Sequence, residues 1–203
     1  MTLDTPSPDE ILALLPAQQG HFRFESGHHG TRWLDVERLY LHPPRIQRLA
    51  GLIAGRIAKH EVQVVCGPLV EGAFVALTVA SELGVPFTYA ERFDDRTSDA
   101  LFPVQYRLPR ALRGEVAGKR VGIVNDIINA GSAVRGAFHD LRAWGAHPVA
   151  LGALLVLGPS AAGFAAEHRL ALEALASLPN DLWTPDECPL CARGIPVVDL
   201  LAP

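Results

Sequence analysis

The chain is poor in lysine, and its charges are close to balanced. Lys59 and Lys119 are its only lysines among 18 Lys and Arg residues. The formal net charge of -4 provides no general attraction to nucleic acids or to anionic membranes. A site for a phosphate group would therefore have to arise from local geometry rather than from bulk charge.

Cysteines and long apolar runs are scarce as well. Cys66, Cys188 and Cys191 are too few for a disulfide scaffold and suit the reducing cytoplasm. The N-terminal segment has no basic stretch followed by an apolar run, so we expect no signal peptide. Glu71, Glu82 and several glycines interrupt the apolar stretches well short of a membrane span. We expect a cytoplasmic protein with neither a membrane nor a nucleic-acid partner.

The chain does have enough apolar sequence for a core. Hydrophobic residues make up 49% of its 203 residues and charged residues 20%, which is typical of a globular protein rather than a disordered one. No repeat or low-complexity linker divides residues 1–203, so we expect a single domain. The proline-rich tail after Asn180 should dock on it as an extension.

Periodic patterns predict alternating strands and helices. The expected helices are 9–15, 45–60, 71–83 and 132–144, with a helical turn at 163–168. The expected strands are 20–27, 32–36, 62–66, 87–90, 104–108, 120–124 and 148–157, with a polar loop at 91–103. This order predicts an α/β fold with a central parallel sheet flanked by helices.

The most informative segment is residues 121–135. It starts as a buried type of strand, continues with Asn125, Asp126 and two apolar residues, and then makes a small-residue turn that opens a helix. In an open parallel sheet, ligands bind beyond the carboxyl ends of the strands, where this turn would lie. Amides at the start of the helix, its dipole and the hydroxyl of Ser132 would bind a phosphate there.

Asn125 and Asp126 would lie beside a sugar attached to that phosphate. A carboxylate at this place can bind ribose hydroxyls and face the positive charge that grows on the ring as the anomeric bond breaks. The simpler alternative is an ordinary joint between strand and helix, with Asp126 as a cap. We favour phosphate binding because strand, acid, small-residue turn and helix agree along the whole segment.

Residues 121–133 read Val-Gly-Ile-Val-Asn-Asp-Ile-Ile-Asn-Ala-Gly-Ser-Ala. This resembles the motif of type I phosphoribosyltransferases, which has four apolar residues, two acids, two apolar residues and a turn such as Thr-x-Gly-Thr. Residues 20–29 resemble the base-binding segment of orotate phosphoribosyltransferases, and residues 186–196 resemble the tail of one bacterial branch of them. The likeness therefore spans most of the chain in the family's order.

The resemblance implies the type I phosphoribosyltransferase fold, in which residues 1–40 and 180–203 would form a small hood or extension. It implies transfer of 5-phosphoribose from 5-phosphoribosyl-1-pyrophosphate, carried with Mg²⁺, to a nucleobase. Orotate is the base that it favours, which would give orotidine 5'-phosphate and pyrophosphate in pyrimidine synthesis or salvage. The family's lid often reaches the partner subunit's site, so a homodimer is implied too.

The resemblance also assigns roles to positions. Asp126 and Arg96 would be catalytic, with Mg²⁺ near Asp126, and residues 92–103 would form a lid that excludes water. The base would be bordered by Phe24, Ser26, Trp33 and Leu34. The site for phosphoribosyl pyrophosphate would comprise Asn125, Asp126, Asn129, Ala130, Gly131, Ser132, Ala133, Gly67, Pro68, Glu71, Gly72 and Arg92.

The chain departs from the family's pattern at four places. Asn125 replaces the first acid of the motif, and Arg96 is the nearest basic residue to a missing lid lysine. Glu71 stands where the family has glycine or lysine; it would repel pyrophosphate unless a metal bridged them, yet it suits the first turn of a helix. Residues 155–160 lack the arginine that meets the carboxylate of orotate, which Arg32 or Arg135 could replace.

Two other functions stay open for these reasons. The missing arginine motivates the same reaction with another base. The changes at Asn125, Glu71 and the lid motivate a regulatory protein that binds phosphoribosyl pyrophosphate or a nucleotide without turnover. In that case residues 92–103 would be only a solvated acidic loop.

Cys188 and Cys191 form a Cys-x-x-Cys pair, which is half of a structural zinc site. A second pair is missing, so we expect a reduced structural pair rather than zinc shared between subunits. A redox role is disfavoured because the pair is not expected to open a helix. His28 and His29 follow a turn near the expected base pocket; at most one can face it, and we expect both to be surface histidines.

Overall fold

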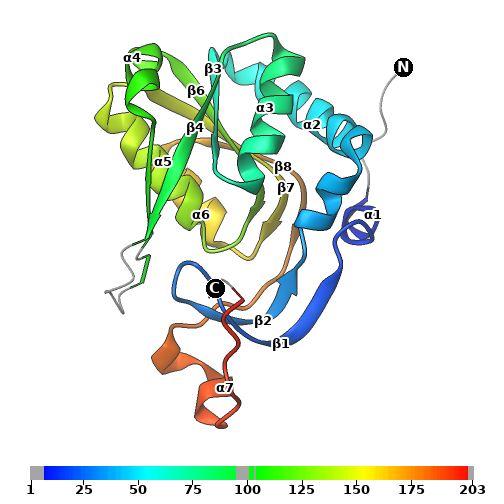
Figure 1. The fold of residues 1–203 in the computed structure, drawn as a ribbon. Coiled ribbons are helices and arrows are strands. Elements are labelled where there is room, and N and C mark those ends of the chain that lie inside the picture. Colours follow the sequence, from blue (N-terminus) through cyan, green and yellow to red (C-terminus); the bar gives the residue numbers. More distant parts are fainter. Residues whose placement is uncertain (1–6, 95–100, 103, 201–203) are drawn as a thin grey trace.

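The computed structural model describes residues 7–94, 101–102 and 104–200, and a six-stranded sheet forms its centre (Figure 1). The strand order is β5-β4-β3-β6-β7-β8, and neighbours are parallel except for the antiparallel pair β4 and β5. The strands are β3 Val64–Pro68, β4 Phe87–Asp94, β5 Val104–Arg107, β6 Arg120–Ile128, β7 His147–Leu157 and β8 Ala171–Leu178. The predicted α/β fold is confirmed.

Helices cover both faces of this sheet. Their bounds are α1 Pro8–Leu12, α2 Pro43–Ile57, α3 Glu71–Leu83, α4 Arg113–Val116, α5 Ser132–Ala143 and α6 Ser160–His168, with short 3-10 turns at Glu37–Leu41, Ala58–His60 and Arg110–Leu112. Val124 of β6 packs into a core shared with α2 and α3, and its neighbour Ile123 packs into a second core shared with α5 and α6. Both residues are fully buried, as expected for a parallel strand covered on two sides.

Helix α3 shows how local signals set its bounds. The predicted helix 71–83 is confirmed residue for residue. It ends at Gly84, whose φ of 66° lies in the left-handed region that glycine adopts without strain. None of the described helices has the length and apolar character that a membrane crossing requires.

Two parts of the sheet differ from the prediction. Residues 91–94 continue β4 and pair with β5, so the expected loop at 91–103 was wrong over its first four residues. The sequence there is polar, and only the ladder to β5 makes it a strand. Strand β8 was not predicted, because its run of alanines and leucines does not distinguish a strand from a helix.

A second, two-stranded sheet lies below the carboxyl edge of the first one (Figure 1). It pairs β1 Ala17–Arg23 with β2 His29–Leu34 in antiparallel order. The C-terminal tail returns to it, since the amide of His29 donates to the carbonyl of Trp183 at 2.8 Å and the amide of Val198 to that of His21 at 2.7 Å. We call residues 17–34 together with residues 183–198 the hood.

The tail of the hood carries two short elements, a 3-10 turn at Pro185–Glu187 and α7 at Pro189–Ala192. Cys188 stands at the N-cap of α7. The expectation that the Cys-x-x-Cys pair would not open a helix was therefore wrong, because Pro189 starts a helical turn directly after Cys188. His29 was wrongly expected at the surface; its ring is buried between β1 and the tail.

Candidate functional site

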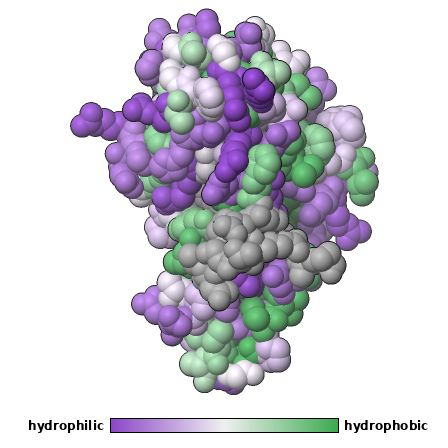
Figure 2. Space-filling model, turned by 60° about the vertical axis from the view of Figure 1, so that its left-hand side comes forward, coloured by the Kyte–Doolittle hydropathy of each residue, from purple (hydrophilic) through white to green (hydrophobic). Residues whose placement is uncertain are grey.

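A cleft of about 790 Å³ lies between the hood and the carboxyl ends of the central strands. Chain connections run from β3 to β4 on one side and from β6 to β7 and β8 on the other. The order of strands therefore reverses between β3 and β6, which is where open α/β sheets bind ligands. In Figure 2 the upper part of this face is largely hydrophilic, whereas hydrophobic residues are more frequent beside its narrow middle and in the lower part.

The turn between β6 and α5 forms one wall of the cleft. Gly131 has a φ of 88° and precedes the first residue of α5, Ser132. Such a conformation favours glycine, and it turns the chain so that α5 starts at the cleft. Asn129 accepts a hydrogen bond from the side-chain amide of Asn180 at 3.0 Å, which ties the turn to the segment that leads into the hood. The lining residues of this turn are Asn129, Ala130, Gly131, Ser132 and Ala133.

Asp126 lies at the bottom of the same wall and is only 8% exposed. Burial, assisted by the nearby carboxylates of Glu71 and Glu37, raises the pKa of Asp126 from 3.8 to about 7. Hydrogen bonds from the backbone amides of Ile127 and of Asp126 itself lower this pKa, but by less than burial raises it. The carboxyl group therefore changes charge close to neutral pH, and a bound cation or hydroxyl donors would favour its ionised form.

Asn125 also lines the cleft, but its side chain holds the loop together. Its amide nitrogen donates to the carbonyl of Ile127 at 2.7 Å. Its oxygen lies against Gly72, where a Cβ atom would overlap it. An amide fits this place better than a carboxylate, because only the amide can donate to Ile127.

Gly67, Pro68 and Gly72 are buried behind the wall rather than exposed in the cleft. A Cβ atom on Gly67 would overlap α3 at Ala73, so this glycine lets the helix pack closely on β3. The cleft is lined instead by the next residues, Leu69, Val70 and Glu71, and the Leu69–Val70 peptide bond is cis.

Glu71 lies where either of the roles considered for it would place it. It is the first residue of α3, where its charge suits the helix dipole, and it lines the cleft. The hydroxyl of Tyr40 donates to its backbone carbonyl at 2.8 Å. Burial, together with Asp126 and Glu71, raises the pKa of Tyr40, so this phenol stays neutral.

Acidic side chains outnumber basic ones in the cleft. Within the described part of the chain, the carboxylates and guanidinium groups that line it belong to Glu25, Glu37, Glu71, Glu91, Asp126, Arg32 and Arg92. Arg92 lies 3.5 Å from Glu25, whose carboxylate also accepts a hydrogen bond from the hydroxyl of Tyr106 at 3.0 Å. A metal cation would offset the repulsion between these acids and a polyphosphate.

Two of the expected catalytic features fall partly or wholly outside the described residues. Arg96 lies among residues 95–100, which the structure does not describe, and half of the expected lid 92–103 falls in the same segment. Arg92 lies at the edge of the cleft, on β4.

The hood supplies the opposite wall. Phe24, Ser26, Trp33 and Leu34 all line the cleft, as expected for a base site. The rings of Phe24 and Trp33 are stacked, with centroids 6.2 Å apart and planes at 9°. Together they present apolar surface on which a flat ring could pack.

The two arginines considered as partners for a carboxylate differ in position. Arg32 lines the cleft on the hood side. Arg135 does not; its guanidinium lies 4.4 Å from the ring centre of Phe164, and its Nε donates to the carbonyl of Ala130 at 3.4 Å. Arg135 therefore stabilises the β6–α5 turn from behind.

Sequence reasoning missed three of the residues that shape this site. Glu25, Glu37 and Tyr106 line the cleft, although no motif marks them. Glu25 directly follows Phe24, so its place in the base-binding segment was a usable signal. Glu37 and Tyr106 reach the cleft only through the fold, from a 3-10 turn and from β5.

Comparisons with known proteins agree with this arrangement. Residues 35–168 match the family described as "Phosphoribosyl transferase domain". The chain is 31% identical to an orotate phosphoribosyltransferase of Desulforamulus reducens, over 88% of this chain and 86% of that protein. It is also 31% identical to that of Pelotomaculum thermopropionicum, over 94% and 95%.

Solved structures share the fold at lower identity. An orotate phosphoribosyltransferase from Aeropyrum pernix has a TM-score of 0.62 at 19% identity, over 82% of this chain and 89% of that one. An adenine phosphoribosyl transferase from Trypanosoma brucei, in complex with AMP, pyrophosphate and ribose-5-phosphate, has a TM-score of 0.67 at 16% identity, over 86% and 81%.

Proposed function

The chain belongs to the phosphoribosyltransferase family, and from this premise we propose that it transfers 5-phosphoribose from 5-phosphoribosyl-1-pyrophosphate to orotate. The products are orotidine 5'-phosphate and pyrophosphate. One observation carries the proposal: the β6–α5 turn and the stacked rings of Phe24 and Trp33 face each other across one cleft. A sugar phosphate and a flat base need these two walls at the same time.

The β6–α5 turn is proposed to bind the 5-phosphate. Amides at the start of α5 and the hydroxyl of Ser132 donate to its oxygens, and the helix dipole favours its charge. Gly131 keeps the backbone free of side-chain atoms next to the phosphate. Asn129 and Ala133 complete the rim.

Asp126 is proposed to act on the ribose. Its ionised carboxylate accepts hydrogen bonds from the ribose hydroxyls and stabilises the positive charge that develops on the ring as pyrophosphate leaves. Burial strengthens this effect, because little water screens the charge. Asn125 positions the loop through its bond to Ile127.

We propose Mg²⁺ as the companion of the pyrophosphate. The excess of acids over bases in the cleft supports it, since Glu71 and Asp126 offer the hard oxygen ligands that this ion prefers. Bound there, the ion would offset the repulsion between these carboxylates and the phosphates. Arg92 and Arg96 are proposed to contact the departing pyrophosphate, and residues 92–103 to form the lid.

Arg32 supports orotate as the base. A guanidinium can bind a planar carboxylate with two parallel hydrogen bonds, and Arg32 lies on the wall of Phe24 and Trp33. Glu25 and Glu37 favour a second candidate, a base with amino or ring N–H donors and no carboxylate. Both candidates share the same chemistry at the ribose.

Turnover tests the proposal directly. Purified protein is mixed with phosphoribosyl pyrophosphate, Mg²⁺ and one of a panel of bases, and pyrophosphate release is followed. We expect the highest kcat/KM with orotate, and a rise in the KM for orotate but not for phosphoribosyl pyrophosphate in Arg32→Gln. A faster reaction with another base would replace orotate by that base. Binding without release with any base would support a regulatory protein instead.

We also propose that the protein acts as a homodimer in the cytoplasm. Phe74 and Leu77 lie at helical spacing on one face of α3 and are 48% and 52% exposed, and Val70, directly before α3 at the rim of the cleft, is 55% exposed. An apolar face of this kind is typical of an interface. Light scattering of the wild type and of Phe74→Glu tests it: we expect a dimer that becomes a monomer, and a monomeric wild type would exclude it.

A further inference from the structure

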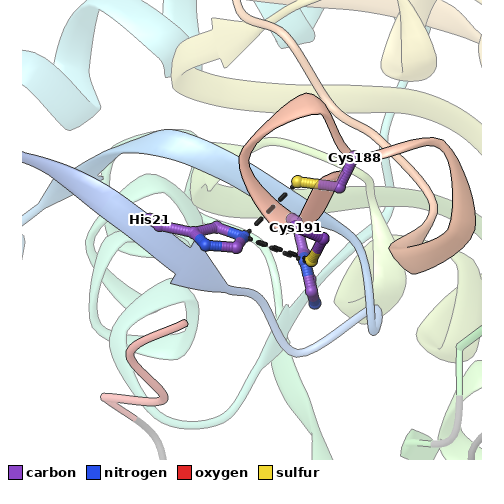
Figure 3. A group of neighbouring side chains, drawn as sticks. His21, Cys188 and Cys191 are labelled. Atoms are coloured by element: carbon purple, nitrogen blue, oxygen red, sulfur yellow. Dashed lines mark hydrogen bonds between the residues drawn. The ribbon is translucent and has the colours of Figure 1, made fainter. Parts of the chain in front are cut away.

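Four potential metal ligands meet in the hood, away from the cleft. His21 of β1, His29 of β2, and Cys188 and Cys191 on either side of the start of α7 each offer one donor atom, and these atoms all lie within 4.8 Å of one another. His21 extends from β1 towards the two cysteines on the turn of α7 (Figure 3). The second pair of ligands, missing from the sequence pattern, therefore comes from the two histidines of the hairpin.

Four of the six distances between these donor atoms are close to those of a tetrahedral site. Zn–N bonds of about 2.0 Å and Zn–S bonds of about 2.3 Å place neighbouring ligands of a tetrahedron roughly 3.3 to 3.8 Å apart. The two ring nitrogens, His21 Nε2 and His29 Nδ1, are 3.1 Å apart. The Sγ atom of Cys188 lies 3.4 Å from His21 Nε2, and that of Cys191 lies 3.3 Å from His29 Nδ1 and 3.8 Å from His21 Nε2.

The orientation of His21 suits a ligand. Its other ring nitrogen, Nδ1, lies 2.8 Å from the backbone carbonyl of Ile195. A carbonyl only accepts hydrogen bonds, so Nδ1 carries the proton and Nε2 directs its lone pair at the other three donors. Partners of this kind fix the ring of a metal-binding histidine.

Burial also favours a cation over a bare polar cluster. His21 is 3% and His29 6% exposed, and Cys188 is 2% exposed. Two imidazoles and two thiols that converge in so little space crowd their protons together, whereas a divalent cation would satisfy all four lone pairs at once. Cys191 is exposed, so an ion could enter from its side.

The hood has little else to hold it together. Among the described residues, the two apolar cores take only Leu34 from the hood. A two-stranded hairpin is marginally stable by itself, and small modules without a core commonly rely on a metal. The four side chains lie where the hairpin meets the tail, so an ion bound by them would stabilise both.

We propose that His21, His29, Cys188 and Cys191 bind one structural Zn²⁺ ion within a single chain. Two thiolates and two imidazoles in a closed tetrahedron favour zinc over the harder cations. The ion joins the C-terminal tail to the β1–β2 hairpin, and so fixes the wall that bears Phe24 and Trp33. It takes no part in the transfer reaction.

Metal analysis of the intact protein decides the proposal. The protein is purified under reducing conditions without chelator from cells grown with zinc, and its metals are measured by mass spectrometry. We expect about one zinc per chain, and tetrahedral cobalt bands with thiolate charge transfer after exchange with Co²⁺. Cys188→Ser and His29→Gln should fall to background zinc.

Two matched variants control for general effects. Cys66→Ala removes the third cysteine, which is buried in β3, and His28→Gln changes the histidine next to His29. Both should keep the full zinc content. Wild-type protein without stoichiometric zinc, or with an octahedral cobalt spectrum, would overturn the proposal even if every variant misfolded. Wild-type protein that is isolated without metal and with a Cys188–Cys191 disulfide would also overturn the proposal, in favour of a redox pair.

Discussion

The two walls of the cleft are built in different ways. The β6–α5 turn rests on a strand that is buried in an apolar core on each face, and backbone geometry shapes it. The hood wall is formed by a hairpin and a returning tail. These two segments are joined by a few backbone hydrogen bonds and a cluster of polar side chains. The first wall thus inherits the stability of the sheet, whereas the second needs stabilisation of its own.

This difference assigns the transfer reaction and the choice of base to different walls of the cleft. The wall that would bind the sugar phosphate is formed by the part of the chain that is most difficult to deform. The wall that would bind the base belongs to a separate layer, where changes do not disturb the sheet. Substitutions in the first wall should therefore alter the reaction itself, and those in the second should alter the choice and affinity of the base.

The largest effect is expected from Asp126→Asn. The variant keeps the shape of the side chain but removes the charge that faces the developing cation, so kcat should fall about 10²- to 10³-fold. In the wild type, kcat/KM should rise as the pH increases through about 7, where Asp126 ionises in the free protein. Initial rates between pH 5.5 and pH 9 measure both effects.

The free energy of unfolding should change with pH in the opposite direction to kcat/KM. The pKa of Asp126 in the folded state, about 7, exceeds its ordinary value of 3.8, so the folded protein binds this proton more tightly than the unfolded chain. The free energy of unfolding therefore falls as the pH rises between these values, by about 1.4 kcal/mol for each pKa unit. Asp126→Asn avoids this loss, and urea unfolding at pH 8 should show it a few kcal/mol more stable than the wild type. A control, the exposed Asp181→Asn, should change neither property.

The next largest effect concerns the hood wall. Trp33→Ala removes the ring that stacks on Phe24, which should raise the KM for the base about 10- to 100-fold. The KM for phosphoribosyl pyrophosphate should stay within about twofold, because the other wall is intact. Trp144→Ala, on the half-exposed tryptophan after α5, is the matched control. Equal increases in both KM values would contradict the separation of the two walls.

Gly131→Ala tests the backbone of the first wall. A Cβ atom finds room there, but a φ of 88° costs other residues about 1–2 kcal/mol. If the turn moves to relieve the strain, the KM for phosphoribosyl pyrophosphate rises about 5- to 30-fold. Gly118→Ala carries the same kind of strain, with a φ of 69° before β6, and should lose stability without a change in KM.

The smallest effect on turnover is expected from removal of the proposed zinc ion. A chelator should speed amide exchange in the hood about tenfold or more, most of all at Arg23, His29, Trp183 and Val198, whose amides join the hairpin to the tail. Residues 121–128 should exchange as slowly as before. Hydrogen exchange by mass spectrometry reads both regions at once, and equal acceleration in β6 would mean that the two walls are not independent.

The sequence predicted the first wall well for a physical reason. Strand, turn and helix at 120–144 follow from contiguous residues, so a local pattern contains the whole β6–α5 turn. The bounds of α3 and its cap at Gly84 were local in the same sense. The family resemblance then placed Phe24 and Trp33 on the opposite wall.

What the sequence missed depends on long-range contacts. Residues 91–94 become a strand only through pairing with β5, and Tyr106 reaches the cleft from that partner. The cluster of potential metal ligands was missed because its two histidines and its two cysteines are far apart in the sequence, and because two histidines separated by a turn do not resemble half a zinc motif. Spacing rules find metal ligands that are close in sequence. Of these four residues, only the two cysteines have the spacing of a known zinc motif.

The contact between His21 and Cys188 spans 167 residues. A chain that emerges from the ribosome N-terminus first makes β1 and β2 before the central sheet, whereas residues 183–198, which close the hood, follow that sheet. The six-stranded sheet can be complete while the hairpin still waits for its partner. Each newly made molecule therefore completes the hood wall only after residues 183–198 have emerged, and a chain that stops before residue 183 would keep the sheet but leave that wall unfinished.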